Sequence, residues 1–156
     1  MSKMIDAGAQ VDMAEVVSQR IALLHEVVPN SIGDMLNFRL INCDPAAGIY
    51  VLGCKTETWM RNVAGTLHGG MCATVVDQAM GFISYCIKPG EGTAPTVQMQ
   101  VTYHRPLIPG EEVLVTVKVL TVTRSLMHLS AEAVMAYATD KLCLTSSATY
   151  FYKPAK

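Results

Sequence analysis

Residues 63–87 read VAGTLHGGMCATVVDQAMGFISYCI, a long apolar pattern with a single acidic residue inside it. From Met71 onward, apolar residues recur at helical spacing, which predicts one helix of about four turns that is hydrophobic around most of its circumference. Such a helix is normally buried, yet Asp77 lies in its middle. Because a carboxylate in apolar surroundings is costly unless it is paired, hydrogen-bonded or exposed in a cleft, Asp77 is a candidate functional residue.

The start of this helix offers a second candidate site. Gly69 and Gly70 allow close approach to the backbone and leave free N–H groups at the positive end of the helix dipole. Eight residues separate Gly69 from Asp77, which is about 12 Å along a helix, whereas a general base acts within about 3 Å or through one water. If both groups serve one substrate, the second must come from another copy of the chain. Two antiparallel helices would provide this, so we expect an obligate twofold dimer with two composite sites.

Length and composition indicate one domain. The chain has 156 residues, 51% of them hydrophobic, and a net charge of −1. This charge gives no electrostatic footprint for nucleic acid. We expect a single domain over 1–156, with residues 1–11 flexible and a first helix over 12–28 that Asp12 caps.

The cellular setting follows from what the segments lack. Residues 1–10 contain no apolar signal core, and polar residues interrupt 63–87 as a membrane span, so we expect a buried helix and no membrane contact. Five scattered cysteines without a C-x-x-C motif favour free thiols in a reducing cytoplasm. Cys72 lies near the candidate site, but no histidine is placed to activate it, which favours a small core residue. The histidines have no mutual ligand spacing, so no metal site is expected.

The remaining elements are mostly strands. Residues 31–34 are expected to form a loop, and 139–141 a turn near the C-terminus. Antiparallel strands are predicted over 35–43, 49–55, 96–104, 112–123, 126–137 and 142–152. An antiparallel sheet with a long helix against one face is the α+β arrangement that satisfies this pattern.

The stretch from Asn62 to Asp77 resembles the signature of the PaaI-type acyl-CoA thioesterases, in which an asparagine precedes His-Gly-Gly by six residues and the catalytic aspartate follows in the helix. The resemblance covers roughly residues 36–152 and includes PTVQMQVTY at 95–103, a following Pro-Gly and the turn at 139–141. It implies the hotdog fold, in which one sheet wraps a long central helix. It also implies that two chains pair their sheets, form two active sites at that interface and commonly assemble into homotetramers, without a metal or organic cofactor.

The resemblance also implies roles for particular residues. The N–H of Gly69 would receive the thioester oxygen, and Asp77 of the partner chain would activate a water or attack directly. The amide of Asn62 would hold the water or carbonyl, although a loop-capping role is its alternative. His68 is expected to shape the turn through a hydrogen bond to backbone rather than act in proton transfer. Thr96 matches the position where related enzymes carry a hydroxyl that assists the water, and a plain strand residue is its alternative.

Substrate contacts are expected around these residues. Gly70 and Met71 lie beside the helix start, and methionines adapt well to acyl chains, although packing in the core is the commoner role of methionine. Arg124 matches a position that is often basic in the family and would face the phosphates of coenzyme A, although a solvated surface charge is the alternative.

The sequence therefore predicts a cytoplasmic acyl-CoA thioesterase with an aromatic or medium-chain acyl substrate. Two alternatives on the same fold stay open at this point. One is an acyl-CoA hydratase or dehydratase, which would need a histidine placed to move a proton at the α-carbon. The other is a non-catalytic acyl-CoA sensor, which the presence of Asp77 and the lack of an attached helix-turn-helix segment disfavour.

Overall fold

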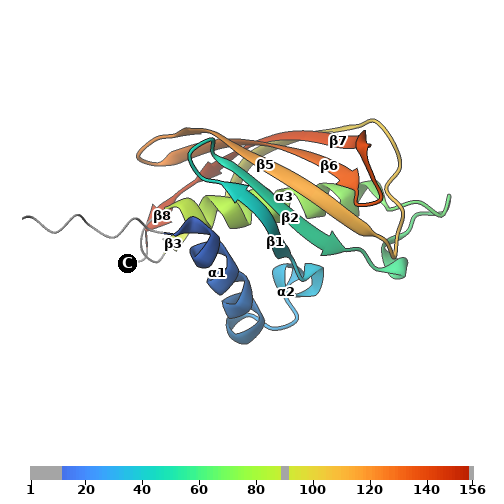
Figure 1. Ribbon diagram of the computed structural model, residues 1–156, viewed down its shortest axis with the longest axis horizontal. Helices are drawn as coiled ribbons and strands as arrows, with labels where there is room; N and C mark the ends of the chain where they lie inside the picture. The colour runs from blue at the N-terminus through green and yellow to red at the C-terminus, as the bar shows by residue number, and fades with distance from the viewer. Residues whose placement is uncertain (1–11, 89–91, 155–156) are drawn as a thin grey trace, which may run out of the picture.

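A computed structural model describes residues 12–88 and 92–154. Residues 1–11, which are predicted to be flexible, lie outside the residues that the structure describes. Six antiparallel strands form one sheet in the order β1-β2-β5-β6-β7-β4, and the long helix α3 (Gly69–Ile87) lies along its inner face (Figure 1). The strands are β1 (Arg39–Asp44), β2 (Ile49–Lys55), β4 (Thr96–Tyr103), β5 (Glu112–Val122), β6 (Leu126–Met135) and β7 (Ala138–Phe151). A short two-stranded sheet joins β3 (Gly92–Thr93) to β8 (Lys153–Pro154).

The core forms where α3 meets the concave face of the sheet. Alternate residues of the central strands point inward, as period-two patterning requires. Val113, Val115 and Val117 of β5 are fully buried, and so are Val76 and Met80 of α3. By length and composition α3 is apolar enough to cross a membrane, but 50% of that window is buried inside the fold. The predicted α+β arrangement of one antiparallel sheet around one long helix is therefore confirmed.

The N-terminal part of the described chain covers one side of α3. Helix α1 (Met13–Val27) is capped by the Asp12 side chain and contacts both α3 and β1 (Figure 1). A five-residue helix, α2 (Ile32–Leu36), follows where a loop over 31–34 was predicted. Ser31 caps it by accepting a hydrogen bond from the N–H of Asp34, and the side chain of Leu36 is buried. A helix of five residues is too short to show a periodicity in the sequence. Because α2 continues to Leu36, the first strand begins at Arg39 rather than at residue 35.

The turn expected over 139–141 is also placed differently. The strands β6 and β7 are joined by the two residues Ala136 and Tyr137, so Thr139 and Asp140 belong to β7. Neither connecting residue is a usual turn former. The N–H of Ala136 donates instead to the carbonyl of Glu112 at 3.0 Å, which ties the turn to the start of β5. A long-range contact therefore fixes this turn, and local sequence does not reveal it.

Buried thiols should make stability fall at alkaline pH. Burial raises the pKa of Cys54 and of Cys86 from the ordinary 9.0 to about 12. Above pH 9 the unfolded chain loses these protons while the folded chain keeps them, so stability present at pH 8 is lost as pH rises toward 12. The slope is up to about 1.4 kcal/mol per pH unit for each thiol. We expect the urea midpoint to fall between pH 8 and pH 10, and to fall less in a Cys54→Ala/Cys86→Ala variant.

Cys43→Ala, at a half-buried position, is the control and should show the same pH dependence as wild type. An equal fall in the double variant would contradict this.

Candidate active site

The start of α3 is shaped by the histidine that precedes it. His68 is the N-cap residue, and its Nδ1 accepts a hydrogen bond from the N–H of Gly70 at 3.0 Å. The His68 side chain thus bonds to backbone and shapes the turn. Within the described part of the chain, no acceptor is recorded for the N–H of Gly69, the first residue of the helix. This N–H is therefore available at the positive end of the helix dipole.

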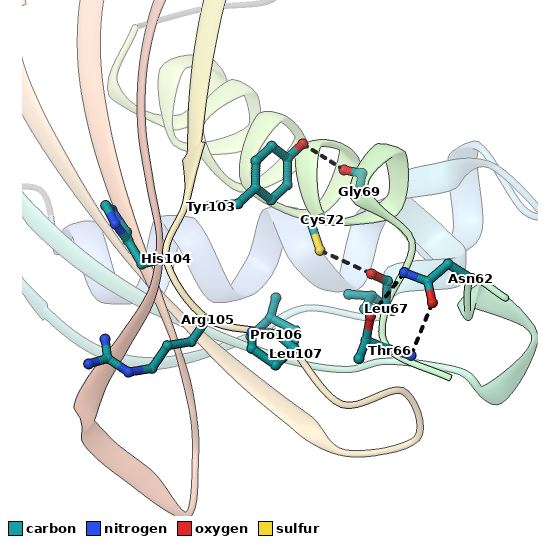
Figure 2. Close-up of a pocket in the computed structure, with 10 residues that line it drawn as sticks. All are labelled: Asn62, Thr66, Leu67, Gly69, Cys72, Tyr103, His104, Arg105, Pro106 and Leu107. Carbon is teal, nitrogen blue, oxygen red and sulfur yellow. Dashed lines mark hydrogen bonds between the residues drawn. The ribbon is translucent and has the colours of Figure 1, made fainter. Parts of the chain in front are cut away.

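A cavity of about 340 Å³ lies at this helix start, which we call the tip pocket. The hydroxyl of Tyr103, from β4, donates to the carbonyl of Gly69 at 2.8 Å and stands beside the helix start (Figure 2). Sequence reasoning missed Tyr103 as a site residue, because a strand tyrosine looks like ordinary sheet packing. The pocket is lined by Asn62, Thr66, Leu67, Gly69, Cys72, Tyr103, His104, Arg105, Pro106 and Leu107.

Asn62 holds the loop that forms one wall of the tip pocket. Its Oδ1 accepts from the N–H of Ala64 at 2.9 Å. Oδ1 also accepts from the N–H of Thr66 at 3.2 Å, and Nδ2 donates to Thr66 Oγ1 at 2.9 Å (Figure 2). These bonds match the loop-capping alternative for Asn62. An amide nitrogen carries two hydrogens, so one N–H of Asn62 is left to contact a ligand.

Cys72 also lines the tip pocket, where burial disfavours the thiolate form of its side chain. The side chain is buried, and its Sγ lies 3.8 Å from the carbonyl of Leu67 (Figure 2). Burial raises the pKa of the Cys72 thiol to about 11. At neutral pH the thiol is protonated, and a protonated thiol is a poor nucleophile. The structure thus agrees with a packing role for Cys72.

Asp77 lies half-buried in the middle of α3 with two hydroxyl donors on one carboxylate oxygen. Its Oδ1 accepts from Thr96 Oγ1 of β4 and from the hydroxyl of Tyr150 of β7, each at 2.9 Å. The structure thus brings Asp77 and Thr96 together. No donor to Oδ2 is recorded among the described residues, which leaves that oxygen for a water or a substrate.

Tyr150 is the second residue that sequence reasoning missed. Its hydroxyl is 73 positions from Asp77 in the chain, and it also lies 3.0 Å from the carbonyl oxygen of Asp77. Burial and then the charge of Asp77 raise the pKa of Tyr150 far above its usual range. The hydroxyl therefore stays protonated and donates to the carboxylate at any physiological pH.

Within one chain the tip pocket and Asp77 are separate. Asp77 is absent from the walls of the tip pocket, and eight helical residues separate it from Gly69, about 12 Å along the axis. One chain therefore does not bring Gly69 and Asp77 to the same reacting atom.

The predicted substrate contacts lie at both ends of α3. Gly70 uses its N–H on His68, and Met71 is half-buried in the first turn. Arg124 is exposed in the turn between β5 and β6, where Lys88, just past the C-terminal end of α3, donates to its carbonyl at 3.4 Å. Arg124 thus lies at the opposite end of α3 from the tip pocket of its own chain. Across the described residues, no three His, Cys, Asp or Glu side chains are grouped to hold a metal.

Known proteins resemble part of this sequence and share its fold. A family model described as the thioesterase superfamily matches residues 64–136. Human acyl-coenzyme A thioesterase 13 is 34% identical over 87 residues, which cover 56% of this chain and 61% of the human protein. The mouse protein of that name is 35% identical over 78 residues, covering 50% of this chain and 55% of that protein. The aligned stretches thus span little more than half of these relatives.

Solved structures extend the likeness over nearly the whole chain. Mouse thioesterase superfamily member 2 has a TM-score of 0.72 at 25% identity, covering 91% of this chain and 98% of that chain. The PaaI protein of the E. coli phenylacetic acid degradation operon has a TM-score of 0.75 at 16% identity, covering 93% and 99%. The sheet around α3 is the hotdog fold. Residues 64–136 are thus similar to the thioesterase superfamily, and the described chain shares the fold of these solved structures.

Proposed function

We propose that this protein hydrolyses acyl-CoA thioesters to the free acid and coenzyme A, at composite sites formed by two copies of the chain. The observation that carries the proposal is the division of polar groups along α3. A free N–H stands at Gly69 over a pocket, and a carboxylate held by two hydroxyls stands at Asp77. The relatives named acyl-coenzyme A thioesterase 13 support the same chemistry.

The N–H of Gly69 receives the thioester carbonyl oxygen. Negative charge develops on this oxygen when the carbonyl carbon becomes tetrahedral. A preorganised N–H donor at a helix start stabilises that charge more than it stabilises the neutral carbonyl. The bond from Tyr103 to the Gly69 carbonyl holds the first helical residue in place while this happens.

Asp77 of the other copy supplies the base. Its carboxylate takes a proton from a water that attacks the carbonyl carbon, or attacks that carbon itself to form a mixed anhydride that water then opens. In either route the C–S bond breaks as the tetrahedral intermediate collapses, and the departing sulfur takes a proton. Thr96 and Tyr150 orient the carboxylate by holding one oxygen, so that the other faces the reaction.

The edge strand β4 is the proposed contact between the two copies. One edge of β4 pairs with β7, and no strand of the described residues pairs with its other edge. Its Val97 and Tyr103 are more than half exposed. An open edge with apolar residues favours pairing with another strand. Antiparallel pairing of two β4 strands would extend the sheet and draw each helix start toward the Asp77 of the other copy. Association of two such dimers and a cytoplasmic location belong to the same proposal.

Thiol release from a panel of acyl-CoAs tests the function. We expect wild-type protein to release coenzyme A from at least one of butyryl-, decanoyl- and phenylacetyl-CoA. Wild-type protein that binds these compounds and releases no thiol would point to a sensor and overturn the proposal. Addition of water to an enoyl-CoA without thiol release would point to a hydratase. The bond from Gly70 to His68 Nδ1 counts against that route, because it engages the nearest imidazole in capping.

Subunit mixing tests the composite site. An Asp77→Asn chain keeps a working helix start, and a Gly69→Pro chain keeps a working carboxylate. If each site uses one group from each copy, refolding the two inactive variants together restores one intact site in every mixed dimer. Random pairing then gives about one quarter of the wild-type activity. A mixture that stays as inactive as its parents, despite forming mixed dimers, would show that each site lies within one chain.

Removing the Tyr150 hydroxyl should slow turnover without unfolding the protein. Tyr150→Phe keeps the buried ring and deletes one of the two bonds to Asp77 Oδ1. A hydrogen bond to a charged group contributes about 1.5–3 kcal/mol, so we expect kcat for thiol release to fall roughly tenfold or more, with KM little changed. Tyr137→Phe, at an exposed tyrosine of the β6–β7 turn, is the matched control. Equal turnover by the two variants would exclude a positioning role for Tyr150.

A further inference from the structure

A second cavity, of about 500 Å³, lies between α1 and the C-terminal half of α3. Its walls are mainly apolar. Leu24 and Val27 of α1 form one side, and Phe82 and Tyr85 of α3 form the other. The outer rim is exposed, with Val27 64% accessible to solvent. We call this cavity the α1–α3 groove.

The α1–α3 groove begins next to the candidate catalytic carboxylate. Gln78 and Gly81 line it, and Gly81 lies one helical turn after Asp77, on the same face of α3. A Cβ placed on Gly81 would stand 3.3 Å from the ring of Tyr150, whose hydroxyl holds Asp77. Ala94, two positions before Thr96, forms part of the same wall. The groove therefore borders the surroundings of Asp77, although Asp77 is not itself one of its lining residues.

The groove has the length of a short alkyl chain. It follows α3 from Gln78 to Tyr85, about 10 Å along the helix axis. At the Tyr85 end the guanidinium of Arg20 lies 4.1 Å from the centre of the Tyr85 ring, and it donates to the Tyr85 carbonyl at 2.8 Å. This stacked pair marks the end furthest from Asp77. An extended alkyl chain of about eight carbons covers this distance, because each C–C bond of about 1.5 Å advances the chain by slightly less than its length.

We propose that the α1–α3 groove binds the acyl chain of the substrate, and that this chain is an unbranched alkyl group of about eight carbons. The inference rests on the proposed function for the identity of the ligand. An alkyl chain in the groove would cover the exposed rim at Val27 and place its carbonyl end beside Asp77. A single aromatic ring would leave most of the groove length in water, so the groove favours a straight-chain acyl group over an aryl one.

Binding of S-alkyl-CoA thioethers, measured by calorimetry, tests this without hydrolysis. Each methylene moved out of water contributes about fourfold in affinity. We expect the dissociation constant to fall by about that factor per methylene from S-butyl-CoA onward, and to level off near eight carbons. Val27→Trp places a large side chain toward the Gln78 end of the groove, where the alkyl chain enters, so the gain per methylene should be reduced throughout its series, with S-decyl-CoA bound at least tenfold more weakly. Ser18→Trp is the matched control, because Ser18 is exposed and nine residues, about 180° around α1, from Val27.

Several results would overturn the inference. If S-decyl-CoA binds no more tightly than S-butyl-CoA, the protein has no alkyl-binding site. If Val27→Trp and Ser18→Trp weaken the binding of S-decyl-CoA equally, the alkyl chain does not lie in the α1–α3 groove. If Val27→Trp dissociates the assembly in sedimentation and leaves the thioether series unchanged, the groove is covered by a second copy of the chain. If the series appears as expected while acyl-CoAs release no thiol, the proposed hydrolysis fails and the alkyl site stands.

Discussion

Replacing Asp77 with asparagine should lower kcat for thiol release by about a thousandfold, within the usual contribution of a positioned base. Asparagine has nearly the same shape as aspartate, and its amide oxygen can still accept from Thr96 and Tyr150, which bond to Asp77 Oδ1 in the wild type. The amide can neither take a proton from water nor attack a carbonyl. The chemistry is therefore lost while the local structure is kept.

The measurement is steady-state thiol release from the best substrate of the panel, with thermal unfolding and sedimentation recorded for each variant. Asp140→Asn makes the same chemical change at an exposed position of β7 and should retain wild-type turnover. A folded, dimeric Asp77→Asn protein with more than a tenth of the wild-type kcat would show that Asp77 is not the base.

Gly69→Pro should lower kcat by about a hundredfold to a thousandfold, the loss typical of deleting one oxyanion donor. Proline has no backbone N–H, so this change removes the proposed donor while it leaves every side chain of the site in place. The first helical position is also where proline is best tolerated, since its N–H has no partner within the helix. His68 has φ −59° and ψ 137°, a conformation that suits the residue before a proline.

Gly69→Ala is the matched control for this experiment. A Cβ at Gly69 would meet its nearest neighbour, the Tyr103 hydroxyl, at 3.7 Å, which is ordinary van der Waals contact. Alanine keeps the N–H, so its kcat should stay within a few fold of wild type. If the alanine and proline variants are equally active, the N–H of Gly69 does not stabilise the reaction. If both lose activity equally, the effect is steric.

Apolar periodicity was enough to predict most of the fold. The buried stripe of α3 and the alternation in β5 are local signals that repeat over many residues, and the structure has both elements where the sequence indicates them. The errors, over residues 31–38 and 139–141, concern short segments. Leu36 anchors α2, and Glu112 anchors the β6–β7 turn, by contacts that no local pattern records.

The site was accessible from sequence only where a residue conflicts with its surroundings. Asp77 and Gly69 stand out because an acid in an apolar helix and glycines at a helix start are each unusual. Tyr103 and Tyr150 conflict with nothing in their strands, so their bonds to Gly69 and Asp77 became visible only in three dimensions. The assignment of Gly69 and Asp77 to one reaction depends on a second copy of the chain, and subunit mixing is the experiment that tests it.

The histidine cap has a consequence for what can compete at the start of α3. A glycine pair at a helix start is also found in phosphate-binding loops, where several backbone N–H groups surround several phosphate oxygens. Here the imidazole of His68 already occupies the N–H of Gly70, so the remaining N–H of Gly69 suits the single oxygen of a carbonyl. Inorganic phosphate and free nucleotides should therefore be poor competitive inhibitors, even though the proposed substrate carries a nucleotide.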